Sequence, residues 1–66
     1  MIGVEVKRRR IKKKLSQEKL ARLADISYNT IVKIETGSTL NPGIKTISKI
    51  AKALGVTVDE LINEPR

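Results

Sequence analysis

Three segments of the sequence repeat one local pattern that marks the start of a helix. In each segment a Ser or Thr directly follows an apolar residue, and a second apolar residue lies four positions after the hydroxyl residue. The three hydroxyl residues are Ser16, Ser27 and Thr57, and Glu60 adds a carboxylate at capping-box spacing to the last of them. Such a hydroxyl accepts a hydrogen bond from a free amide of the first helical turn, while the apolar pair packs across the helix start. The repetition predicts a fold built from short helices.

The spacing of apolar residues extends this prediction to five helices. They are expected over residues 2–14, 17–24, about 27–35, 44–54 and from residue 57 onward. Gly37 and Gly55 follow the third and fourth of these segments, where glycine commonly ends a helix in a left-handed conformation. Residues 37–43 form the one clear loop. The residues expected to face the core are Ile2, Val6, Leu20, Leu23, Ala24, Ile31, Ile34, Ile44, Ile47, Ile50, Ala51, Leu54 and Leu61.

The composition limits both the core and the chemistry of the chain. Its 66 residues suffice for one domain over residues 1–66, and Tyr28 is its single aromatic residue, so the core must consist of aliphatic side chains. The sequence contains no Cys and no His. A disulfide, a zinc site and a thiol or imidazole catalyst are therefore excluded, and we expect neither a metal nor a cofactor.

The charge points to a polyanionic partner. Fourteen Lys and Arg residues against seven Asp and Glu residues give a formal net charge of +7. Nucleic acid and an anionic membrane surface both fit this excess. Seven of the cations fall between Lys7 and Lys14, in a segment predicted to be helical, although such a run is often only a solvated face. The apolar runs are too short for a membrane span, so we expect a cytoplasmic protein.

The second and third predicted helices are separated by a very short turn. Only Asp25 and Ile26 lie between the end of one helix and the cap of the next. A turn this short forces a steep crossing, at which the small side chain of Ala21 permits close approach. An ordinary corner in any helical bundle would share this spacing. The polar residues of the third helix favour a recognition helix instead, because its N-terminal half can reach base edges in the major groove.

At this point the sequence closely resembles the Cro-type repressor family, also called the XRE-type helix-turn-helix family. The resemblance rests on LSQEKLARLADISYNTIVKIETG at 15–37, NP at 41–42 and AKALGVTVDELI at 51–62. It covers nearly the whole chain and implies an all-α, compact five-helix bundle, the lambda-repressor-like DNA-binding domain. It further implies sequence-specific binding of double-stranded operator DNA, with the third helix in the major groove, and regulation of transcription, most simply repression.

The resemblance also implies roles for individual residues. The positions that contact bases fall on Ser27, Tyr28, Asn29 and Lys33. Asn can pair with adenine and Lys can donate to guanine, whereas Tyr could contact a phosphate or a thymine methyl group. The positions that contact phosphates fall on Gln17, Ser38, Thr39 and Asn41. Gln17 lies at a helix N-terminus, where amide donors and the helix dipole favour an anion.

Two charged residues match an internal ion pair of the family. Arg10 and Glu35 would link the first and third helices, although two separate surface charges are the alternative. Three residues depart from the family pattern. Asp25 and Lys14 stand where relatives often have glycine, and Arg9 stands where relatives often bury an aliphatic side chain. These departures put the two turns and the packing of the first helix in question.

The C-terminal part of the sequence predicts a dimer contact. Its aliphatic residues exceed what so small a core can cover, and the expected patch comprises Leu40, Val56, Val58 and Ile62. Simple capping of the core is the alternative. A homodimer, formed either in solution or only on DNA, would read a near-palindromic operator with recognition helices about 34–36 Å apart.

Other classes of function fit the sequence less well. An antitoxin-like protein would need a further arm to bind its toxin, which we do not expect here. A membrane-surface peptide would need bulky apolar residues opposite the basic run, and the first segment has no Trp or Phe. No acid–base pair or nucleophile with its activating base is visible, so we expect a protein that is not an enzyme.

Overall fold

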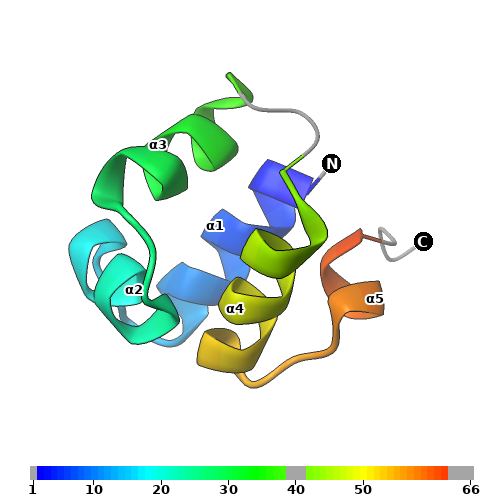
Figure 1. The fold of residues 1–66 in the computed structure, drawn as a ribbon. Helices are drawn as coiled ribbons and strands as arrows, with labels where there is room; N and C mark the ends of the chain where they lie inside the picture. The colour runs from blue at the N-terminus through cyan, green and yellow to red at the C-terminus, as the bar shows by residue number, and fades with distance from the viewer. Residues whose placement is uncertain (1, 39–41, 63–66) are drawn as a thin grey trace.

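Five helices follow one another in the computed structural model, which describes residues 2–38 and 42–62. They are α1 (Ile2–Lys12), α2 (Gln17–Ala24), α3 (Tyr28–Thr36), α4 (Ile44–Leu54) and α5 (Val58–Ile62). Helix α1 packs against α3, α4 and α5, and α2 packs against both α3 and α4 (Figure 1). The predicted all-α bundle of five helices is confirmed for the part of the chain that the structure describes.

The predicted helix starts are confirmed by their hydrogen bonds. The hydroxyl of Ser16 accepts from the amide of Lys19 at 3.0 Å, and that of Ser27 accepts from the amide of Thr30 at 3.1 Å. Thr57 and Glu60 exchange hydrogen bonds in a complete capping box, with Glu60 accepting from the Thr57 amide at 3.0 Å. Each cap supplies a partner for amides that a helix start leaves without one.

Three helices end in the same hydrogen-bonded left-handed turn, two of them without glycine, while α3 ends at Gly37 in a simpler left-handed cap. Gly55 closes α4 with a φ of 71°, whereas Lys14 and Asp25 take φ values of 58° and 57°. In each case the amide of the next residue reaches back across the last helical turn, for example from Leu15 to the carbonyl of Arg10 at 3.1 Å. This is the Schellman closure, and it tolerates Lys and Asp at a cost in backbone energy. Helix α1 therefore ends at Lys12, two residues earlier than predicted.

The core consists of aliphatic side chains from all five helices. The buried apolar residues are Val6, Leu20, Ala21, Ala24, Ile31, Ile34, Ile47, Ile50, Ala51, Leu54 and Leu61. Three predicted core residues are not among them: Ile2 is only partly buried against the core, Leu23 is 53% exposed and Ile44 is 64% exposed. Leu23 lies at the edge of the buried stripe of α2, where small alanines let α3 and α4 pack closely. Ile44 begins α4, ahead of the first turn that meets the core.

Gly3 allows α1 and α3 to approach each other closely. A β-carbon at this position would lie 2.2 Å from the backbone carbonyl oxygen of Ile34. No side chain fits there without moving one helix, because a backbone atom cannot turn aside as a side chain can. The sequence analysis missed this contact, since a glycine near a helix start carries no periodic signal.

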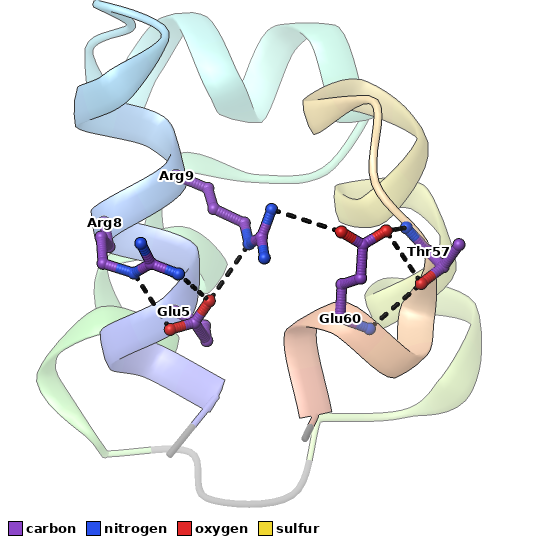
Figure 2. A network of polar contacts seen from close by, with 5 residues as sticks. All are labelled: Glu5, Arg8, Arg9, Thr57 and Glu60. Carbon is purple, nitrogen blue, oxygen red and sulfur yellow. Dashed lines mark hydrogen bonds and ion pairs between the residues drawn. The ribbon is translucent and has the colours of Figure 1, made fainter. Parts of the chain in front are cut away.

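A cluster of ion pairs joins α1 to α5, as Figure 2 shows. The carboxylate of Glu5, which is buried, accepts hydrogen bonds from Arg8 at 2.8 and 3.1 Å and from Arg9 at 3.1 Å. Arg9 also lies 3.6 Å from the carboxylate of Glu60 on α5. The hydrogen bonds from Arg8 lower the pKa of Glu5, and those from Thr57 lower the pKa of Glu60. Arg9 thus replaces the expected aliphatic contact with an electrostatic one.

Candidate nucleic-acid interface

The corner between α2 and α3 is held by a short, well-bonded turn. The amide of Ile26 donates to the carbonyl of Ala21 at 3.0 Å, and that of Asp25 donates to the carbonyl of Arg22 at 3.2 Å. Ala21 is buried at the crossing, as the sequence predicts. These bonds leave little freedom between the two helices, so the direction of α3 is set by the position of α2.

The outer face of α3 carries polar side chains on a rigid support. Ile31 and Ile34 are fully buried and fix the helix to the core. On the opposite side, Tyr28 is 48% exposed, and Asn29 and Lys33 are also exposed. A phenol and an amide therefore project from the first turn of α3 and an ammonium group from its last turn, where each can meet an external partner without disturbing the core.

Ser27 holds a different position from the other predicted base-contact residues. Its hydroxyl caps α3 and also lies 2.8 Å from the hydroxyl of Thr30, in a hydrogen bond between the two side chains. The residue is exposed. Its oxygen is therefore engaged within the helix start, and any contact with an external partner would share that hydroxyl.

Arg10, Glu35 and Gln17 link α1, α3 and α2. Arg10 donates to both carboxylate oxygens of Glu35, at 2.7 and 3.1 Å, and also to the carbonyl of Leu15 at 2.7 Å. The side-chain amide of Gln17 donates to the same carboxylate at 3.1 Å. The side chains of Arg10 and Glu35 are 12% and 3% exposed, so the two charges lie inside the fold rather than on its surface. The sequence analysis did not foresee the contacts of this pair with Gln17 and Leu15.

Gln17 is therefore oriented from within the protein. Its amide nitrogen has two hydrogens, and the bond to Glu35 uses one of them. The residue begins α2, where the helix also presents amides to an anion. Glu35 thus orients the side chain of Gln17, which is predicted to contact a phosphate, and also neutralises Arg10.

The segment after α3 is only partly described. Ser38 is exposed, and its hydroxyl lies 3.2 Å from that of Thr36. Thr39 and Asn41, which were predicted to contact phosphates, lie outside the described residues, as does Leu40 of the predicted dimer patch. Of the other patch residues, Ile62 is 49% exposed. Val56 and Val58 pack partly against the core, so of the described patch residues Ile62 is the one left most exposed.

Most of the positive charge is exposed. Eleven basic residues are exposed: Lys7, Arg8, Lys12, Lys13, Lys14, Lys19, Arg22, Lys33, Lys45, Lys49 and Lys52. Within residues 2–38 and 42–62, no helix is long and apolar enough to cross a membrane. In the same residues, no three acidic side chains gather closely enough to hold a metal ion. The exposed surface of the described residues thus carries more cations than anions.

Comparison with known families identifies the corner formed by α2 and α3. The sequence profile described as helix-turn-helix matches residues 6–61. The chain belongs to the helix-turn-helix family. Members of this family are DNA-binding regulators of transcription rather than enzymes. In this helix-turn-helix chain, α2 and α3 are the two helices of the motif.

Two relatives of the chain are named as regulators of transcription. The chain is 31% identical over 64 residues to the cryptic phage CTXphi transcriptional repressor RstR of Vibrio cholerae, covering 97% of this chain and 57% of RstR. It is 34% identical over 64 residues to the transcriptional regulator SinR of Bacillus licheniformis, covering 97% of this chain and 58% of SinR. The helix-turn-helix chain thus spans little more than half the length of these two curated relatives.

Solved structures show the same fold. A crystal structure of SinR in complex with DNA matches with a TM-score of 0.92 at 32% identity, covering 96% of this chain and 100% of that one. A structure of SinR with SinI matches with a TM-score of 0.93 at 33% identity, covering 97% of this chain and 62% of that one. The arrangement of all five helices is therefore shared with a fold that has been solved on DNA.

Proposed function

We propose that the chain binds double-stranded DNA in a sequence-specific manner and regulates transcription, most simply as a repressor in the cytoplasm. The observation that carries the proposal is the outer face of α3, with Tyr28, Asn29 and Lys33 exposed on a helix anchored by Ile31 and Ile34. The likeness to the SinR–DNA structure supports it. A repressor would act by occupying its operator and excluding other proteins from it.

The side chains divide into two roles. Asn29 and Lys33 would read base edges, because an amide can pair with adenine and an ammonium group can donate to guanine. Tyr28 lies beside them and would contact a phosphate or a thymine methyl group, while Ser27 would add a contact through its capping hydroxyl. Gln17 would contact a phosphate, and Ser38, Thr39 and Asn41 would grip the backbone after α3. These phosphate contacts position the protein on the duplex but do not distinguish one base from another.

Alanine variants should separate the two roles. Asn29→Ala and Lys33→Ala should each weaken binding to the preferred duplex by about 1–3 kcal/mol and reduce the discrimination between bases at one position. Gln17→Ala should weaken binding to all duplexes by a similar factor. The measurement is the affinity of each variant for the preferred duplex and for its single-base variants. The opposite pattern, with altered preference for Gln17→Ala and unchanged preference for Asn29→Ala, would reverse the assignment.

We further propose that two copies bind one operator. Ile62, half exposed at the end of α5, would form the centre of the contact, with Val56, Val58 and Leu40 around it. Because Val56 and Val58 are partly covered by their own core, the remaining patch is small. Such a patch supports a contact that forms when DNA holds two chains side by side, and not a stable dimer in free solution.

A footprint tests the two-chain arrangement. The protected site should be a near-palindrome with half-site centres about 10 base pairs apart. Ile62→Ser should abolish cooperative filling of the two half-sites while leaving the melting temperature of the free chain within a few degrees, since the side chain is half exposed. Independent binding of single chains to a non-palindromic site would contradict the proposal.

A further inference from the structure

A hollow lies between the C-terminal ends of α2 and α4, and none of the residues proposed to contact DNA lines it. Its volume is about 490 Å³. We name it the Leu23 groove, and its lining residues are Leu23, Ala24, Asp25, Lys49, Lys52 and Ala53. Figure 1 shows the lower end of α4 next to α2. Helix α3 contributes no lining residue, so the groove is separate from the recognition helix.

The apolar part of the groove fits one large side chain. Leu23 is 53% exposed at its edge, whereas Ala24 is buried and Ala53 is partly buried. Single exposed leucines are common on protein surfaces and need no explanation. Here the exposed leucine stands beside two alanines whose short side chains leave a hollow next to it. An apolar side chain from outside would contact all three and remove Leu23 from water.

The polar part of the groove favours an anion. Lys49 and Lys52 are exposed one helical turn apart on α4, so both ammonium groups lie along the same edge. Neither takes part in an ion pair with another residue of the described chain. Asp25 is the single acidic lining residue. Two cations against one anion leave the rim positive.

We propose that the Leu23 groove docks an acidic peptide segment of a partner protein, with one large apolar side chain seated against Leu23 and carboxylates beside Lys49 and Lys52. The positive net charge of the chain favours an acidic segment over a second copy of the chain as the occupant. A second copy would bring a net charge of +7 against an equal charge, which opposes association. An acidic segment would meet complementary charge at the rim and an apolar floor within it. The inference goes beyond the proposed function, because none of these residues is assigned to DNA.

Selection from displayed random peptides of about 12 residues on the full chain, in the absence of DNA, tests the proposal. We expect enriched sequences with one large apolar residue flanked by Asp or Glu. A selected peptide, made synthetically and labelled, should bind Leu23→Ser roughly tenfold more weakly than the unchanged chain by fluorescence anisotropy. Reversal of charge in Lys49→Glu with Lys52→Glu should abolish its binding.

Val4→Ser is the matched control, because Val4 is 61% exposed on α1 and lies outside the groove. Both serine variants should melt within a few degrees of the unchanged chain, and Val4→Ser should bind the peptide with unchanged affinity. Enrichment of no peptide, of peptides without acidic residues, or of peptides that bind Leu23→Ser equally well would overturn the proposal. A shift from dimer to monomer in Leu23→Ser by sedimentation would also overturn it, in favour of a second copy.

Discussion

The Glu35→Ala variant should lose about 3–5 kcal/mol of folding free energy, because the change strands the charge of Arg10 inside the fold. Arg10 is 12% exposed on its side chain and donates to both oxygens of Glu35. Gln17 would lose its partner as well. In a domain of this size such a loss approaches the total stability, so the variant should be largely unfolded near room temperature. Thermal unfolding followed by circular dichroism measures the effect.

Two comparisons isolate the cause. Glu18→Ala removes an exposed carboxylate from α2 and should change the free energy of unfolding by no more than about 0.5 kcal/mol. Arg10→Met combined with Glu35→Leu removes both charges and should recover most of the stability, because apolar pairs often replace buried ion pairs without loss. A Glu35→Ala variant with an unchanged melting temperature would show that the two charges do not depend on each other.

The Gly3→Ser variant should lose about 1–3 kcal/mol, toward the upper end of that range, because its β-carbon would collide with the carbonyl of Ile34. The expected separation of 2.2 Å can be relieved only by moving α1 away from α3 or by unwinding its first turn. Either movement would also disturb Glu35, the residue after Ile34. Denaturant unfolding should show a lower midpoint with an unchanged slope.

Gly43→Ser is the matched control for this substitution. Gly43 caps α4 with a φ of −61°, and a β-carbon there would meet nothing within 4 Å. Serine is also a preferred capping residue, so this variant should be as stable as the unchanged chain or slightly more stable. Equal losses in the two serine variants would mean that the close approach of α1 and α3 is not what requires glycine at position 3.

The signals that lie close together in the sequence predicted the fold well. Each cap joins residues three positions apart and each staple joins residues five positions apart, so Ser16, Ser27 and Thr57 could be predicted as helix starts without knowing the tertiary structure. The left-handed ends at Gly37 and Gly55 follow from the same local chemistry. Leu23 was misplaced because helical spacing alone cannot fix the width of a buried stripe. That width depends on how closely the neighbouring helices approach, which Ala21 and Ala24 allow here.

The contacts between distant segments were harder to predict. The pairing of Arg10 with Glu35 was suggested by family resemblance, and the residues alone gave two charges on different helices. The buried Glu5 and the bond from Gln17 to Glu35 had no local signal, because each depends on which helix faces which. Gly3 was missed for the same reason. The polar face of α3 could be predicted from the sequence, because Ile31 and Ile34 define the buried side of the helix. Tyr28, Asn29 and Lys33 fall outside that side and are exposed.

Recognition of a particular DNA sequence is the central claim, and one comparison of affinities tests it most directly. The full chain is used to select a duplex from a random pool, and its affinity for that duplex is compared with its affinity for a shuffled duplex of equal composition at about 0.15 M salt. We expect at least a roughly thousandfold preference for the selected duplex, with affinity falling steeply as salt increases. Equal affinity for the two duplexes, or an affinity that does not respond to salt, would contradict the account.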